Sequence, residues 1–175
     1  MLVDVQFDGI DLDIEEPTVT TENIRKLVQD LRKDIPRGPS SKFVITSAPV
    51  ASALENQAIS PSPNVNYTAL MNDFNCYIVQ FYNGFGDILK YEDFENAVKI
   101  KPLFFVACIL TNKVCAGSEY AQQWYHTPEE IKQKMPRIRD CPGFYGICGW
   151  NYQNALINNR IDPLNWAKVM FDMLK

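Results

Sequence analysis

The sequence predicts an α/β protein whose strands are parallel and alternate with helices along the chain. Residues 7–49 contain a strand pattern, a helical pattern and a second strand pattern, which together describe a parallel βαβ unit. Residues 103–110 form a continuous apolar run, as expected for a parallel strand that is covered on both faces. In all, five strand patterns are separated by helical or irregular segments. We therefore expect a parallel sheet flanked by helices.

The first strand, expected at residues 7–15, alternates apolar and acidic side chains. Asp11, Asp13 and Glu15 are two positions apart, so an extended chain projects them from one face and the intervening apolar residues from the other. Acids at this spacing stand about 7 Å apart, and gathering them costs free energy through repulsion and desolvation. Because the apolar face can be buried under helices, we interpret the acidic face as a functional site rather than a solvated surface.

A calcium loop is an alternative interpretation, because EF-hand loops also place acids at two-residue intervals. Such loops carry a glycine for a sharp turn, whereas here bulky apolar residues separate the acids and no glycine follows them. The pattern therefore favours a strand over a calcium loop.

A helix and a second strand follow. Thr21 is the expected N-cap of the helix. Its apolar face repeats every three or four positions and comprises Ile24, Leu27, Val28, Leu31 and Ile35. Residues 36–41 end the helix, and residues 43–49 form the second strand. Residues 50–66 are polar and contain prolines, which predicts a long loop before a short helix at residues 67–73.

The C-terminal half continues the alternation. Strands are expected at residues 76–83 and 143–150, on either side of the apolar run described above, with a helix at residues 91–98 and an irregular segment at residues 112–123.

Two helix starts carry clear local signals. Thr127 is followed by a proline at the first turn and by Glu130, which is the pattern of a capping box. The pair Asp162-Pro163 opens a final helix. The apolar residues expected on that helix are Leu164, Val169, Met170 and Met173.

Length, composition and net charge exclude several classes of function. The 175 residues suit one domain, and 46% hydrophobic and 22% charged residues are ordinary for a globular protein. A net charge of −4 provides no basic surface for nucleic acid and no attraction to anionic lipid, so neither is expected as a partner. The N-terminus lacks the basic region of a signal peptide, and no apolar run is long enough to span a membrane.

The cysteines fit no zinc spacing, because no C-x-x-C motif occurs and His126 is the only histidine. Cys108 and Cys148 lie in apolar strand patterns and are expected to be buried thiols. A bridge between Cys115 and Cys141 stays open, because the sequence does not fix it.

Four acids at fixed spacing, Asp8, Asp11, Asp13 and Glu15, with Gly9 after the first and apolar residues between the others, resemble the signature of glycoside hydrolase family 18. This family contains chitinases and some endo-β-N-acetylglucosaminidases. The resemblance implies a (β/α)8 TIM barrel with this signature on the fourth strand. Asp8 and Gly9 would then be structural.

Later segments resemble class III-type chitinases in the same order. Residues 45–49 resemble their fifth strand, residues 79–83 their sixth, residues 103–110 their seventh and residues 146–150 their eighth. A complete barrel typically needs about 250 residues. The resemblance therefore implies the C-terminal part of a barrel, about five βα units covering strands four to eight, truncated at its N-terminus.

Several residues on these strands are candidate substrate contacts. Gln80 and Tyr82 share a strand face and offer an amide and a phenol to sugar hydroxyls and an acetamido group. Trp150 ends a strand, where its indole can stack on the apolar face of a pyranose. Asn83 and Ala48 complete the expected substrate-binding set. For Gln80, Tyr82 and Trp150 the alternative is ordinary core packing.

The resemblance also implies a substrate-assisted mechanism, in which the acetamido oxygen of the sugar attacks the anomeric carbon and the configuration is retained. Glu15 would be the general acid, holding a proton near neutral pH because of Asp13 and partial burial. Asp13 would orient the acetamido group and stabilise the oxazolinium intermediate, with Asp11 modulating Asp13. Tyr82 would hydrogen-bond the acetamido oxygen, and this mechanism would need neither a metal nor an organic cofactor.

These observations predict a chitinase-like hydrolase of β-1,4-linked N-acetylglucosamine polymers, formed by a single incomplete domain at residues 1–175. Its expected partner is chitin or chitooligosaccharide, and the resemblance implies an extracellular location. Two alternatives stay open: an inactive or vestigial carbohydrate-binding fragment, and an endo-β-N-acetylglucosaminidase. An open five-stranded piece would also leave two unpaired strand edges, so self-association through these edges is expected.

Overall fold

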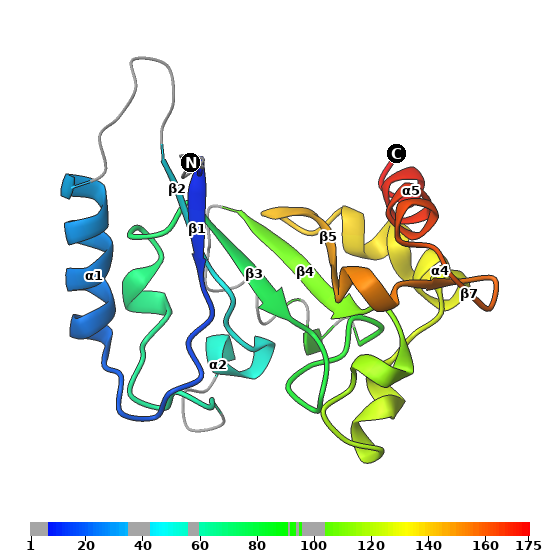
Figure 1. Ribbon diagram of the computed structural model, residues 1–175, viewed down its shortest axis with the longest axis horizontal. Helices are drawn as coiled ribbons and strands as arrows, with labels where there is room; N and C mark the ends of the chain where they lie inside the picture. The colour runs from blue at the N-terminus through cyan, green and yellow to red at the C-terminus, as the bar shows by residue number, and fades with distance from the viewer. Residues whose placement is uncertain (1–6, 35–42, 56–59, 91, 94, 96–103) are drawn as a thin grey trace, which may run out of the picture.

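The strands of the sheet all run in the same direction and lie in chain order. The computed structural model describes residues 7–34, 43–55, 60–90, 92–93, 95 and 104–175. The strands are β1 (Gly9–Leu12), β2 (Val44–Ser47), β3 (Cys76–Gln80), β4 (Phe105–Leu110) and β5 (Phe144–Trp150). Each pairs in parallel with the next strand along the chain, which is the arrangement of a TIM barrel (Figure 1). The predicted fold class, part of a TIM barrel, is confirmed.

Helices flank this sheet. They are α1 (Thr21–Asp34), α2 (Ala51–Glu55), α4 (Pro128–Arg139) and α5 (Pro163–Met173). Figure 1 shows the sheet between α1 on one side and α4 and α5 on the other, with the arrowheads of β3 and β4 pointing towards the segment that follows β4. A short hairpin of β6 (Leu156–Ile157) and β7 (Arg160–Ile161), which we did not predict, precedes α5.

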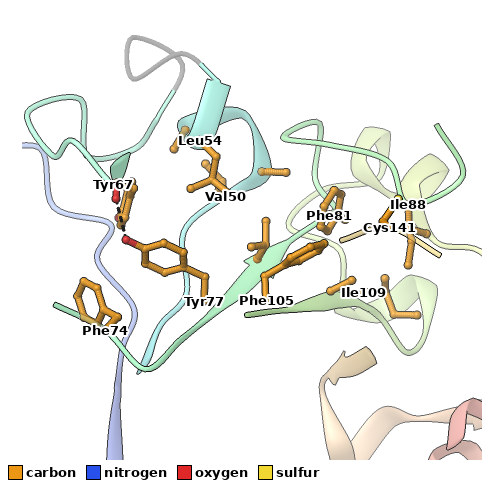
Figure 2. Packing of buried hydrophobic residues seen from close by; sticks show 14 of the residues in the cluster. Val50, Leu54, Tyr67, Phe74, Tyr77, Phe81, Ile88, Phe105, Ile109 and Cys141 are labelled. Atoms are coloured by element: carbon orange, nitrogen blue, oxygen red, sulfur yellow. Dashed lines mark hydrogen bonds between the residues drawn. The ribbon is translucent and has the colours of Figure 1, made fainter. Parts of the chain in front are cut away.

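One face of the sheet packs against the helices and carries the main core. Tyr77, Val79 and Phe81 alternate along β3 and just beyond it, and all three are buried in a cluster that includes Val28 of α1 and Ile131 of α4. Figure 2 shows this packing, in which the hydroxyl of Tyr77 donates to the carbonyl oxygen of Tyr67 at 2.7 Å. We call this side of the sheet the helix-covered face.

The residues between them point the other way, because side chains alternate along a strand. On this inner face, Tyr82, Cys108 and Leu110 form a separate and smaller buried cluster, with Ile78 and Cys148 partly buried against it. The sheet therefore has a separate buried cluster on each of its two faces.

β1 is shorter than the predicted strand at residues 7–15. It pairs with β2 from Gly9 to Leu12, and beyond this point β2 has ended and the chain turns into α2. The apolar side of β1 is also less buried than expected: Ile10 is 40% exposed, whereas Leu12 and Ile14 pack partly buried against the core. The strand lies at an edge of the sheet, which explains this exposure.

The start of α1 corrects our choice of cap. The hydroxyl of Thr20, not that of Thr21, accepts from the backbone N–H of Asn23 at 3.3 Å, and the Asn23 side chain accepts from the Thr20 N–H at 3.1 Å. The hydroxyl of Thr21 instead accepts from the N–H of Asn66 at 2.8 Å. Of the predicted apolar face, Ile24 and Val28 are buried, but Leu27 is 44% exposed because the buried stripe is narrower than the pattern.

Residues 50–66 are not only a loop. Helix α2 forms there, with Ala51, Ala53 and Leu54 buried in the core. The apolar residues at its start pack against the helix-covered face, and this tertiary contact outweighs the polar composition of the rest of the segment. The predicted short helix at residues 67–73 is present as a 3-10 turn at Thr68–Leu70.

The two later helices start where predicted. Thr127 accepts from the N–H of Glu130, whose side chain accepts from the Thr127 N–H, so the capping box is confirmed. Asp162 caps α5 by accepting from the N–H of Asn165. On α5, Met170 is buried and Val169 and Met173 pack partly buried against the core, as predicted, but Leu164 is 75% exposed and Trp166 is buried instead.

Three further expectations concern a helix outside the described residues, the cysteines and membrane spans. The predicted helix at residues 91–98 lies largely outside the described residues, as do Ile35 and the helix end at residues 36–41. All five cysteines are free thiols, so no bridge joins Cys115 to Cys141. None of the described helices is long and apolar enough to cross a bilayer.

Candidate active site

The carboxylate of Asp13 is held by a glutamine from another strand. Gln80, the last residue of β3, donates from Nε2 to Asp13 Oδ1 at 3.0 Å and to the carbonyl oxygen of Ala48 at 2.8 Å. Asp13 and Ala48 directly follow β1 and β2, so these contacts join the carboxyl ends of three neighbouring strands. Both amide hydrogens of Gln80 are engaged, which leaves its Oε1 as the atom that can accept from a ligand.

The carboxylate of Asp11 has its own partner on β2. Thr46 lies opposite Asp11 in the parallel register, and its hydroxyl donates to Asp11 Oδ1 at 2.5 Å. We assigned no role to Thr46 from the sequence. Its position two residues before Ala48, on the same strand face, was the one signal that could have identified it.

The backbone between the acids is fixed from the loop that follows α2. Ser62 is fully buried and donates from Oγ to the carbonyl oxygen of Ile14 at 2.9 Å. Ile14 separates Asp13 from Glu15, so this bond restrains the segment that presents both carboxylates. Nothing in the proline-bearing segment distinguished Ser62 from its neighbours, and the contact depends on tertiary structure alone.

Electrostatics favour proton uptake at Asp13. The surrounding protein removes part of its hydration, and this partial burial raises the pKa of Asp13 above its ordinary value. The nearby carboxylates of Glu15 and Asp11 raise the pKa of Asp13 further, and the hydrogen bond from Gln80 lowers it. All three acids remain accessible to solvent, so a ligand can reach them.

Tyr82 reaches the same region from the inner face. It lies two residues after Gln80, is 6% exposed, and packs against Cys108 and Leu110. Burial raises the pKa of Tyr82 well above its usual range, and Cys108 and then Asp13 contribute to the same shift. The phenol is therefore neutral at physiological pH and keeps a proton that it can donate.

The other expected substrate contacts lie further away. Trp150 ends β5, at the opposite edge of the sheet from β1, and is 48% exposed. Asn83 has φ 56°, and its Oδ1 accepts from the N–H of Gly117 at 3.2 Å, so it holds the segment that follows β4.

Asp8 and Gly9 serve the strand itself. Asp8 is exposed, and its carbonyl oxygen accepts from the N–H of Val44 at 2.9 Å. A Cβ at Gly9 would collide with the carbonyl oxygen of Val44, so only glycine permits this close pairing of β1 with β2. Within the described part of the chain, no three His, Cys, Asp or Glu side chains are placed to hold a metal ion.

Comparisons with known proteins bear on the fold of this chain. No protein-family model and no curated protein matches the sequence. A fungal endo-β-N-acetylglucosaminidase from glycosyl hydrolase family 18 is 32% identical, with a TM-score of 0.78 over 96% of this chain and 57% of its own. Chitinase ChiC from Aspergillus fumigatus is 29% identical, with a TM-score of 0.72 over 96% of this chain and 59% of its own. A GH18 chitinase from Pseudoalteromonas aurantia shares the fold, at 21% identity and a TM-score of 0.69 over 95% of this chain and 61% of its own.

The fold and the site together define part of an α/β barrel with acidic residues at the carboxyl ends of its strands, which is where TIM barrels carry their active sites. With the two solved structures near 30% identity, the chain is related to glycoside hydrolase family 18. It spans 57% and 59% of the length of these two relatives.

Proposed function

We propose that this chain forms the catalytic centre of a chitinase-like glycoside hydrolase that cleaves β-1,4-linked N-acetylglucosamine. The observation that carries the proposal is the grouping of Asp11, Asp13 and Glu15 with Gln80 and Tyr82 across neighbouring strand ends. We also propose that residues 1–175 act as one domain and that the protein works outside the cell, where chitin occurs.

In the proposed reaction, the carboxyl group of Glu15 gives its proton to the glycosidic oxygen as the bond from that oxygen to the anomeric carbon breaks. The acetamido oxygen of the substrate forms the new bond to the same carbon, on the opposite face. Asp13 orients the acetamido group and balances the positive charge of the oxazolinium intermediate. Water, deprotonated by the Glu15 carboxylate, then attacks the anomeric carbon as the bond from that carbon to the acetamido oxygen breaks, so the starting configuration is retained.

The surrounding residues prepare Asp13 for this role. Gln80 and the backbone anchored by Ser62 fix its position, and Thr46 fixes Asp11 beside it. The hydroxyl of Tyr82 is neutral and donates to the acetamido oxygen. Trp150 is the proposed stacking surface for the sugar at the cleavage position.

Hydrolysis of a fluorogenic chitobioside by the purified 175-residue chain tests this function. We expect Glu15→Gln to lower turnover by about 10²–10⁴-fold, because a positioned general acid contributes this much. Glu16→Gln is the matched control, since the Glu16 side chain accepts hydrogen bonds from the N–H and the hydroxyl of Thr18 and a glutamine keeps an acceptor there. Turnover of Glu15→Gln at the parent rate would show that another group is the acid.

The same samples should pass through size-exclusion chromatography, because β1 and β5 are the edge strands of the sheet that the described residues form, and strand edges can pair with another copy of the chain. A folded, monodisperse parent without turnover would contradict hydrolysis by this chain. It would leave the carbohydrate-binding fragment, which equilibrium binding to chitooligosaccharide would detect.

A second candidate, an endo-β-N-acetylglucosaminidase, is favoured by the identity of 32% to a fungal enzyme of that description. Both activities cleave beside an N-acetylglucosamine unit, so the same acids serve either. Release of an N-glycan from a glycoprotein, with no turnover of chitobioside, would select this candidate.

A further inference from the structure

An exposed aromatic pair lies at the same end of the sheet as the carboxylates. Tyr120 and Trp124 belong to a 3-10 segment, Tyr120–Trp124, within the stretch that follows β4. Figure 1 shows that β3 and β4 point towards this stretch. The carboxyl ends of the strands are also where Asp13 and Gln80 lie.

Two contacts tie this pair to the candidate active site. The N–H of Gly117 donates to Asn83 Oδ1 at 3.2 Å, and the ring of Trp124 lies against Gly84, where a Cβ would approach to 3.2 Å. Asn83 and Gly84 directly follow Tyr82 in the chain. Trp124 is also partly buried against the cluster that contains Tyr82. The position of the pair is therefore tied to the residues that follow Tyr82 and to the cluster that contains it.

The geometry presents one ring rigidly to solvent. The rings of Tyr120 and Trp124 meet edge to face, with centroids 5.3 Å apart and an interplanar angle of 74°. Trp124 is the half-buried anchor, whereas Tyr120 is 75% exposed. An aromatic ring fixed in this way offers contact area at a small cost in side-chain entropy, and its exposure leaves apolar surface uncovered.

The surroundings of the ring indicate what covers it. Its neighbours in the segment are polar, Glu119 and Gln122 and Gln123, and they include no cation that would attract phosphate. A pyranose combines an apolar C–H face, which stacks on a phenol ring, with a polar rim, which suits amide and carboxylate groups.

We propose that Tyr120, supported by Trp124, is a stacking platform for an N-acetylglucosamine unit of the oligosaccharide, outside the cleavage position. This inference rests on the proposed function and extends its substrate site from Tyr82 along the segment that follows β4. It implies that longer chitooligosaccharides bind more tightly than chitobiose.

The chain contains a matched control at the other end of the sheet. Tyr145, near the amino end of β5, is 73% exposed and meets Phe104 edge to face at 5.2 Å. It equals Tyr120 in residue type, exposure and ring contact, but it lies away from the strand ends that carry the acids.

Calorimetric titration with chitohexaose in the Glu15→Gln background tests the platform, because binding is then measured without turnover. We expect Tyr120→Ala to weaken chitohexaose binding about tenfold, as the loss of one aromatic contact of this kind implies. Tyr120→Phe, which keeps the ring, and Tyr145→Ala should both bind like the background. Circular dichroism should show all variants folded, since both tyrosines are at the surface.

Unchanged affinity of Tyr120→Ala, or an equal loss in Tyr145→Ala, would overturn the platform. If the background binds chitohexaose and the parent hydrolyses chitobioside, that result leaves the proposed function intact. Absence of any chitohexaose binding by the folded background would overturn both.

Discussion

Consecutive residues at the end of β3 have opposite environments. Phe81 is fully buried among the helices, whereas Gln80 and Tyr82 on either side of it face the carboxylates on the inner face. The helix-covered face is an apolar core joined to α1, α4 and α5. Among the described residues, the inner face has only the small apolar cluster around Tyr82, and hydrogen bonds hold the carboxylates of Asp11 and Asp13.

This difference shows that one strand contributes to stability through one face and to the candidate active site through the other. Apolar burial on the helix-covered face supplies stability, and a polar group buried there without a partner costs free energy. The inner face keeps charged and polar groups at a cost in stability, and hydrogen bonds across strands hold them in place. Substitutions on the two faces should therefore separate folding from activity.

The largest expected effect is a loss of stability on the helix-covered face, in the variant Phe81→Ala. Removing a fully buried phenylalanine leaves a cavity, so we expect the free energy of unfolding to fall by about 3–5 kcal/mol. Urea denaturation followed by circular dichroism measures this. Phe171→Ala on α5 is the control, because Phe171 is exposed and should change stability by less than about 0.5 kcal/mol. Equal losses would show that the helix-covered face is not the main source of stability.

On the inner face, Gln80→Ala should lower activity. The variant loses the donor to Asp13, a hydrogen bond to a charged group, so kcat should fall roughly 10–100-fold. That hydrogen bond lowers the pKa of Asp13, so its removal raises this pKa. The acidic limb of the pH–rate profile should therefore move to higher pH.

Gln29→Ala on α1, an exposed glutamine, should leave both kcat and the pH profile unchanged. A Gln80→Ala profile that keeps the parent's acidic limb would mean that Gln80 does not position Asp13. The shift of the limb separates positioning from a general loss of structure.

The smallest expected effect is the loss of stability when the polar contact between Asp87 and His126 is broken. Asp87, in the loop after β3, accepts from His126 at 2.7 Å, and both side chains are largely buried. Burial alone would raise the pKa of Asp87, but hydrogen bonds from His126 and the N–H of Leu89, with the charges of His126 and Lys90, lower it overall. We expect Asp87→Asn to cost about 1–3 kcal/mol of stability at neutral pH.

The pH dependence of this loss has a defined sign. A carboxyl group whose pKa is lowered by folding stabilises the protein above its unfolded pKa of 3.8, and this contribution disappears as pH falls through the folded value. The stability gap between parent and Asp87→Asn should therefore close in acid. Asp172→Asn is the control, because Asp172 also accepts a hydrogen bond at 2.7 Å, from Lys175, but lies at the surface. A constant gap at all pH values would exclude charge at Asp87 as the cause.

Local patterns determined much of this protein. The alternation at Asp11, Asp13 and Glu15, the strand–helix order and the capping box at Thr127 all depend on residues within a few positions of one another. The parallel sheet then follows, since βα units in succession have few other ways to pack. Because side chains alternate along a strand, the sequence also placed Gln80 and Tyr82 on one strand face.

Only the tertiary structure decided which groups meet across strands. The partners Thr46 for Asp11 and Gln80 for Asp13 depend on strand register, and the contact of Ser62 with Ile14 depends on how a distant loop packs. Register and loop packing arise from contacts far apart in the sequence, which no local period encodes. Helix α2 and the burial of Trp166 were misjudged for this same physical reason, and Thr21 was misjudged as the cap because its hydroxyl accepts instead from the N–H of Asn66 in a distant loop.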